Sequence, residues 1–160
     1  MNDAVVAEAL IAERKRLGHD RHDEVHAGRY IVNAAPNFRH NRLVAQTVIW
    51  LDQHCGDDEY VGDTVNVGPS DDFRITDACV RAESAGDALW ALDGACRVAV
   101  DVLSPDEAPD AKLSHYASHG VGVYIEVDPG AATVRAVELA GWHVEPDVIE
   151  SQLAAHLGFD

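Results

Sequence analysis

Basic residues are scarce in this sequence. The 160-residue chain has 12 lysines and arginines against 28 aspartates and glutamates, so its formal net charge at pH 7 is −16. Such a charge argues against non-specific attraction to nucleic acid, which a basic surface normally provides. Any nucleic-acid binding therefore requires a local group of basic side chains or a partner protein. The alternative interpretation is that the acidity only keeps the protein soluble.

Long hydrophobic runs are also missing. No apolar segment approaches the roughly 18–20 residues that span a bilayer, so we expect no membrane association. The first residues mix acidic and basic side chains and lack a small-residue cleavage site, so we expect no signal peptide. The cysteines Cys55, Cys79 and Cys96 are scattered without C-x-x-C spacing, which is typical of buried thiols in a reducing compartment. These features predict a cytoplasmic protein.

The length and the apolar content indicate one domain over residues 1–160. Apolar residues make up 47% of the chain, which is enough for a hydrophobic core, expected over about 24–145. Apolar residues at helical spacing predict an N-terminal helix, a long helix and a C-terminal helix, over about 3–17, 37–54 and 146–159. Leu10 and Leu17 share one face of the first helix, and Asn37 is a plausible N-cap of the second.

Short alternating segments predict a β-sheet. The expected strands lie over about 28–33, 59–67, 73–82, 95–103, 121–127 and 132–139. A helix over about 106–119 connects two of these strands as a crossover, and the turn at 128–130 predicts a hairpin. The polar segments 19–27 and 83–94 are expected to be connectors. The pattern predicts an α/β fold, a mixed β-sheet flanked by helices.

Two aspartates interrupt the predicted strands, where a carboxylate is costly unless it is paired or binds a metal. Asp77 lies in the strand 73–82, Asp101 lies in the strand 95–103, and Lys112 follows on the next helix. If the strands are neighbours, the two carboxylates meet, and they repel each other unless a cation lies between them. Mg²⁺ or Mn²⁺ suits such oxygen ligands. A nearby lysine suits phosphodiester hydrolysis, because it can neutralise charge in the transition state.

A purely structural interpretation stays open on these residues alone. Asp77 can end a strand, Asp101 can bond to the turn that follows it, and Lys112 can be a solvated helix residue. Three histidines among acidic residues form another candidate metal site: His19, His22 and His26. Their spacing matches no standard zinc pattern, so a solvated connector is the alternative there.

Several motifs follow one another in a fixed order along the chain. They are Glu13-Arg14, Leu17-Gly18, Asp23-Glu24-Val25, Pro36, Arg39-His40, the segments 72–77 and 100–105, and finally Lys112, Tyr116, Gly120-Val121, Tyr124 and Val127-Asp128-Pro129. Together they resemble the Uma-type (Uma-two) family of restriction endonucleases, a branch of the PD-(D/E)XK nuclease-like superfamily. The last set is the most specific, because its four spacings hold together. The resemblance covers about residues 13–145.

The resemblance implies a restriction-endonuclease-like fold and Mg²⁺-dependent hydrolysis of DNA phosphodiester bonds. It implies that Asp77 and Asp101 bind the metal together with the backbone carbonyl of Val102. Lys112 would be the catalytic lysine, carried by the following helix because Leu103 occupies its usual strand position. DNA would be bound over a local basic patch, made of Arg39, Arg42 and Arg74.

The resemblance also implies accessory roles for Glu24 and His40, through water to the metal or to phosphate. The alternatives are a surface acid and a residue of the helix N-terminal turn. The chain departs from the family pattern where Thr76 replaces a proline and Ala111 replaces an acid. The alternative function is therefore a catalytically inactive nuclease fold that acts as a binding or assembly module. Double-strand cleavage with one site per chain suggests a homodimer.

Overall fold

The computed structural model describes residues 3–86, 88–105, 107–108 and 110–159. Its helices are α1 (Asp3–Leu17), α2 (Phe38–Asp52), η1 (Glu83–Ala85, a 3₁₀ turn), α3 (Leu113–Ser118) and α4 (Pro146–Leu157). Its strands are β1 (Glu24–His26), β2 (Arg29–Ile31), β3 (Glu59–Gly62), β4 (Asn66–Val67), β5 (Arg74–Ile75), β6 (Ala78–Ala82), β7 (Trp90–Ala91), β8 (Cys96–Val102), β9 (Val123–Asp128) and β10 (Thr133–Glu138).

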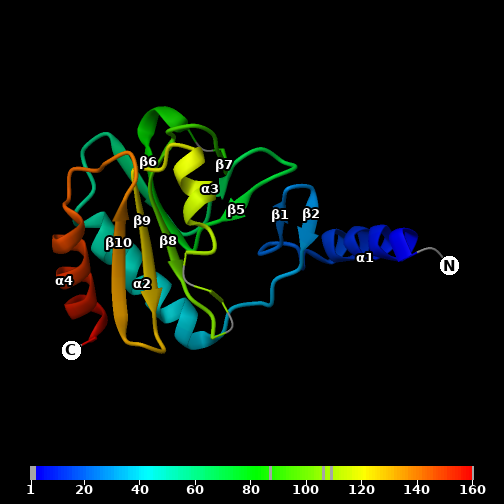
Figure 1. Ribbon diagram of the computed structural model, residues 1–160, viewed down its shortest axis with the longest axis horizontal. Helices are drawn as coiled ribbons and strands as arrows, with labels where there is room; N and C mark the ends of the chain where they lie inside the picture. Colours follow the sequence, from blue (N-terminus) through cyan, green and yellow to red (C-terminus); the bar gives the residue numbers. More distant parts are fainter. Residues whose placement is uncertain (1–2, 87, 106, 109, 160) are drawn as a thin grey trace.

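The centre of the molecule is a five-stranded sheet with the order β10-β9-β8-β6-β3 (Figure 1). β8 and β9 run parallel and are joined through α3, whereas the other neighbouring pairs are antiparallel. The hairpin β9–β10 begins its pairing at Asp128 and Thr133, on either side of the predicted turn. The expected mixed sheet flanked by helices is confirmed.

Two apolar layers cover the sheet. On one face, Trp50 and Leu51 of α2 and Ile149 and Leu153 of α4 pack against alternate residues of β8 and β9, such as Val100. Alternation along a strand sends neighbouring side chains to opposite faces. The other face carries Ala99 and Tyr124, which pack with Tyr116 of α3. Asp101 follows the alternation of Ala99 and therefore points toward the α3 side.

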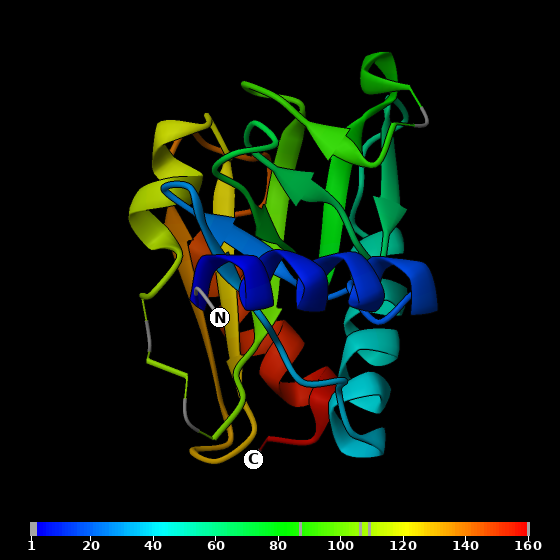
Figure 2. The same ribbon diagram turned by 90° about the vertical axis from the view of Figure 1, so that its right-hand side faces the viewer.

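Helix α1 extends away from the five-stranded sheet, and β1 and β2 lie between α1 and that sheet (Figures 1 and 2). Its predicted apolar face is not covered, because Leu10 and Leu17 are exposed. The segment 19–27 is more than the connector that its polarity predicts. It contains β1, and its residues Asp23 and Glu24 are buried.

Two predicted strands are each divided between sheets. The segment 59–67 forms β3 and β4, and the segment 73–82 forms β5 and β6. The second break falls at Thr76, whose backbone and hydroxyl exchange hydrogen bonds with Val65 instead of continuing the main sheet. The segment 83–94 is not an unstructured connector either, since it contains η1 and β7. Asp77 thus precedes β6 and does not interrupt it.

The helix predicted over 106–119 is much shorter. Residues 107, 108 and 110–112 are not helical, and Asp106 and Pro109 lie outside the described residues. Asp110 has a φ of +64°, a left-handed conformation that a right-handed helix cannot contain. Lys112 is accordingly the N-cap of α3 and not a residue on its surface. No helix in the described part of the chain is long and apolar enough to cross a bilayer.

Candidate active site

The side chain of Lys112 is the centre of a buried polar cluster. Its Nζ lies 3.0 Å from Oδ1 of Asp101 and 3.0 Å from Oε1 of Glu24. It also donates a hydrogen bond of 2.9 Å to the carbonyl oxygen of Ile75. An ammonium group has three N–H donors, so these acceptors use its full capacity. Lys112 is therefore not a solvated helix residue.

Asp101 is a carboxylate built into the interior of the sheet. It lies in β8, and its side chain is only 2% exposed. Besides the contact with Lys112, its Oδ2 accepts a hydrogen bond of 3.2 Å from the hydroxyl of Tyr116. Burial raises the pKa of Asp101 to about 7, the charge of Lys112 opposes this rise, and the charge of Asp77 adds to it. The ammonium of Lys112 favours the ionised form of this carboxylate, whereas burial and the charge of Asp77 disfavour it.

Glu24 reaches the cluster because β1 is tied to the segment before Asp77. The Phe73 N–H donates to the carbonyl of Val25, and the Ile75 N–H donates to Oε1 of Glu24 at 2.8 Å. Oε2 of Glu24 lies 2.8 Å from Nε2 of His26. Burial alone would raise the pKa of Glu24, but the charge of Lys112 and these hydrogen bonds outweigh it and lower the pKa. Glu24 is not a surface acid.

Asp77 and His40 lie on the more open side of the cluster. The antiparallel register of Ala78 with Val100, continued by one residue, places Asp77 opposite Asp101. Oδ2 of Asp77 accepts a 2.8 Å hydrogen bond from the Val102 N–H and lies 3.2 Å from Nε2 of His40. The hydrogen bond between His40 and Asp77 raises the pKa of His40, although burial opposes the rise. Within the described residues, Nδ1 of His40 is buried without a hydrogen-bond partner.

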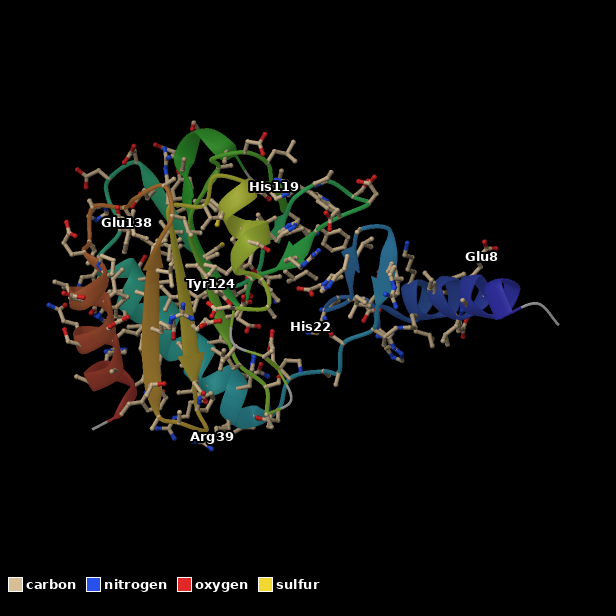
Figure 3. The ribbon with its side chains drawn as sticks, in the orientation of Figure 1. Glu8, His22, Arg39, His119, Tyr124 and Glu138 are labelled. Carbon is tan, nitrogen blue, oxygen red and sulfur yellow. The ribbon has the colours of Figure 1, made fainter. Side chains whose placement is uncertain are left out.

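A cleft of about 1030 Å³ opens over this cluster. Glu24, His40, Asp77 and Lys112 all line it. The residues that line it also include His22, from the segment before β1, and Arg39, from the start of α2 (Figure 3). The five side chains that the sequence singled out therefore come together, four of them at the wall of one cleft and Asp101 directly behind Lys112.

Comparison with known proteins identifies the family. The family described as "Uma2: Putative restriction endonuclease" matches residues 9–158. This chain belongs to the Uma2 family. The fold also resembles the crystal structure of a "putative nuclease belonging to DUF820" from Anabaena variabilis, with a TM-score of 0.65 and 16% sequence identity over 84% of this chain and 90% of that chain. No curated protein matches the chain.

The donor set of this Uma2-family site suits a hard divalent cation. Asp77 and Asp101 offer carboxylate oxygens, as Mg²⁺ prefers, and Mg²⁺ commonly takes only one or two carboxylates beside water and phosphate. The cluster holds the carboxylates of Glu24, Asp77 and Asp101 against the single ammonium of Lys112 and the imidazole of His40. This excess of negative charge disfavours anions and favours an added cation.

A site with three or more protein ligands is not found. Among the residues that the structure describes, no group of three His, Cys, Asp or Glu side chains is arranged to hold a metal ion. Within the same residues, His19, His22 and His26 form no metal site, and His26 instead contacts Glu24. The metal-binding roles of Asp77, Asp101 and the Val102 carbonyl stay predictions.

A further carboxylate, on β9, was not among the predicted site residues. Glu126 is buried and pairs in register with Asp101 across the parallel strands β8 and β9. The sequence contained a signal for Glu126, because this residue interrupts an apolar strand in the same way as Asp101. The role of Tyr116 as a hydrogen-bond donor to Asp101 gave no separate signal beyond its place in the motif.

Proposed function

We propose that this Uma2-family protein is a divalent-metal-dependent endonuclease that hydrolyses DNA phosphodiester bonds in the cleft. The observation that carries the proposal is the convergence of Asp77, Asp101, Glu24 and Lys112 at one point, with contacts of 3.0 Å from Nζ of Lys112 to Asp101 and to Glu24. A buried cluster with excess negative charge is costly to maintain without a function. The family and the fold agree with a nuclease.

The metal would be held by Asp77, Asp101 and the backbone carbonyl of Val102. Mg²⁺ or Mn²⁺ would supply Lewis-acid stabilisation of charge on the phosphate oxygens. The residues of this chain position the ligands: Val102 N–H orients Asp77, and Tyr116 orients Asp101. These contacts fix both carboxylates before substrate arrives, which is the preorganisation that electrostatic catalysis requires.

Lys112 would act through its positive charge and not as a general base. Burial alone would lower its pKa, but the charges of Asp101 and Glu24 raise it well above the ordinary value. Its ammonium group therefore stays protonated, and its charge can neutralise charge that develops on the phosphate. His40 would help to orient Asp77, because its Nε2 lies 3.2 Å from Oδ2 of that carboxylate.

DNA contacts at the cleft would depend on few arginines. Arg39 lines the cleft, and its Nη2 donates to the carbonyl of Pro129 at 3.0 Å. Arg42 is exposed on α2, one position beyond the first turn. Arg74 does not fit the predicted patch, because its side chain is only 12% exposed and its guanidinium is engaged by Asp72 and the Val25 carbonyl.

The direct test replaces Asp77, the more exposed of the two carboxylates at 26%. We expect Asp77→Ala to reduce Mg²⁺-dependent nicking of supercoiled plasmid by at least about 100-fold, which corresponds to about 2.7 kcal/mol of transition-state stabilisation. Asp101→Asn should have the same effect while keeping the buried shape. Asp57→Ala, in an exposed turn, is the matched control and should leave nicking unchanged.

The alternative, an inactive nuclease fold, makes a different prediction. If the wild-type protein does not nick DNA, and millimolar Mg²⁺ or Mn²⁺ neither raises its melting temperature nor changes its spectra, the inactive binding module is favoured. If both variants cleave as fast as the wild type after contaminating nucleases are excluded, the proposed site is wrong.

A further inference from the structure

Lys112 is carried by an irregular loop and not by a sheet strand, so something must fix that loop. Asp110 stands two residues before Lys112 and has a φ of +64°. A non-glycine residue in this left-handed region is strained and persists only where its surroundings hold it. The Leu113 N–H bonds to the Asp110 carbonyl at 3.1 Å, so the conformation of Asp110 directly sets the start of α3.

The carboxylate of Glu126 holds the backbone of Asp110 from the neighbouring strand. The Asp110 N–H donates a hydrogen bond of 2.6 Å to Oε1 of Glu126, which also accepts 3.2 Å from the hydroxyl of Tyr124. Arg135 of β10 completes the arrangement. Its Nη1 lies 2.6 Å from Oδ1 of Asp110 and 2.9 Å from Oε2 of Glu126. Both the main chain and the side chain of Asp110 are thus bound to rigid strands.

Glu126 is not placed to act on substrate itself. Both of its oxygens are occupied, Oε1 by Asp110 and Tyr124 and Oε2 by Arg135, and its side chain is 4% exposed. The cleft is lined instead by Ala111 and Lys112 from the same loop. A buried carboxylate in an apolar strand is costly, and anchoring the loop is a function that its contacts serve directly.

We propose that Glu126 and Arg135 are positioning residues for Lys112. They hold Asp110 in its left-handed conformation, and this directs the side chain of Lys112 back between Glu24 and Asp101. The proposal rests on the proposed nuclease function only for its effect on catalysis. Its structural part, the anchoring of the loop, is tested without any activity.

The sequence provides an activity-independent probe of the loop. The chain has only two lysines, Lys15 in α1 and Lys112, so a lysine-specific endoprotease cuts at these two positions. Cleavage after Lys112 requires local opening of the loop, whereas cleavage after Lys15 is an internal reference. Arg135 is 44% exposed, so its replacement should leave the fold intact. We expect Arg135→Ala to increase cleavage at Lys112 about 10-fold relative to Lys15.

Matched variants separate anchoring from general destabilisation. Arg97→Ala removes an exposed arginine from β8 and should leave the cleavage ratio unchanged. Glu126→Gln keeps an oxygen that accepts the Asp110 N–H, so it should retain most of the protection that Glu126→Ala loses. An unchanged ratio in Arg135→Ala, or equal loss in the Gln and Ala variants, would overturn the anchoring role.

Kinetics test the consequence for catalysis. If the wild type nicks DNA, Arg135→Ala should lower kcat about 10-fold with KM for DNA within about twofold, because the reacting geometry changes and the DNA contacts do not. An unchanged kcat despite increased cleavage at Lys112 would refute the catalytic part. If the wild type has no activity, the proposed function fails, while the protease ratio still decides whether Glu126 and Arg135 anchor the loop.

Discussion

At the scale of single residues, the position of Lys112 shows why the site needed more than spacing to be found. Eleven positions separate Asp101 and Lys112 in sequence, yet Nζ and Oδ1 are 3.0 Å apart. Leu103, at the usual strand position of the lysine, is buried instead. A local pattern cannot encode this contact, because the loop conformation at Asp110 creates it. The order of Asp77, Asp101 and Lys112 suggested the site, and the family resemblance favoured it over a purely structural interpretation.

The contact of Asp23 with Arg14 leads to a prediction about pH. Nε and Nη2 of Arg14 lie 2.7 and 2.8 Å from the Asp23 carboxylate, which also accepts from the Tyr30 hydroxyl and the Asn33 N–H. Burial would raise the pKa of Asp23, but these hydrogen bonds outweigh it and lower the pKa. A lowered folded-state pKa stabilises the protein above the unfolded value, and this contribution is lost as pH falls through the folded value.

We therefore expect Asp23→Asn to lower the free energy of unfolding by about 1–3 kcal/mol at pH 7. The difference from the wild type should stay constant down to about pH 4 and shrink below it. Urea denaturation at a series of pH values measures this, with the exposed Asp52→Asn as control. A difference that already disappears between pH 7 and pH 5 would contradict the assignment.

At the scale of elements, long periodic segments were predictable and divided ones were not. The sequence located α2 to within two residues at each end, because its apolar residues repeat over several turns. The sequence pattern predicted β3 and β4 as one strand, and β5 and β6 as another, because the alternation of apolar and polar residues continues across each break. The breaks are decided by pairing with distant segments, such as Thr76 with Val65, which no local pattern contains.

Helix α2 gives a testable prediction at this scale, because it carries His40 in its first turn. The Asn37 side chain accepts a 3.0 Å hydrogen bond from the His40 N–H, so the predicted N-cap is confirmed. We expect Asn37→Ala to lower the free energy of unfolding by about 1 kcal/mol. Asn37→Asp should match or exceed the wild type, because the first turn of α2 has no acidic residue to complement the helix dipole.

Chemical denaturation followed by circular dichroism compares these two variants with the wild type. Asn37→Ser is the matched control, since its hydroxyl can still accept the hydrogen bond. Equal stability of the Ala and Ser variants would show that the cap contributes nothing to α2.

At the scale of the whole molecule, the acidic surface limits how this protein can hold DNA. The net charge is −16, and of the predicted arginine patch only Arg39 and Arg42 are available, because Arg74 is engaged within the protein. If the protein contacts only a few phosphates, much of its affinity for DNA would have to come from the metal site.

A homodimer, which we propose for double-strand cleavage, would double the number of arginines on one duplex. Sedimentation at micromolar concentration tests that assembly.

The salt dependence of DNA affinity tests whether the protein holds DNA through only a few arginine–phosphate contacts. For duplex DNA the slope of log K against log salt is about −0.9 for each phosphate contacted by a cationic side chain. With Arg39 and Arg42 as the available arginines, we expect a shallow slope of about −2 per chain for the Asp77→Ala variant, which should keep these arginine contacts without cutting the DNA. Adding Arg39→Ala should make the slope shallower by about 1. Fluorescence anisotropy of a labelled duplex measures both values.

The matched control for this measurement is Arg97→Ala in the same background. It removes the same charge at the far end of β8 from Asp101, so the net charge changes equally in both variants. If long-range charge alone governs binding, the two arginine variants will show the same slope. If Arg39 contacts phosphate, only its replacement reduces the slope, because counterion release depends on direct contacts and not on net charge. A slope steeper than about −5 would instead place DNA on a larger basic surface, which the acidic chain could supply only through a partner protein.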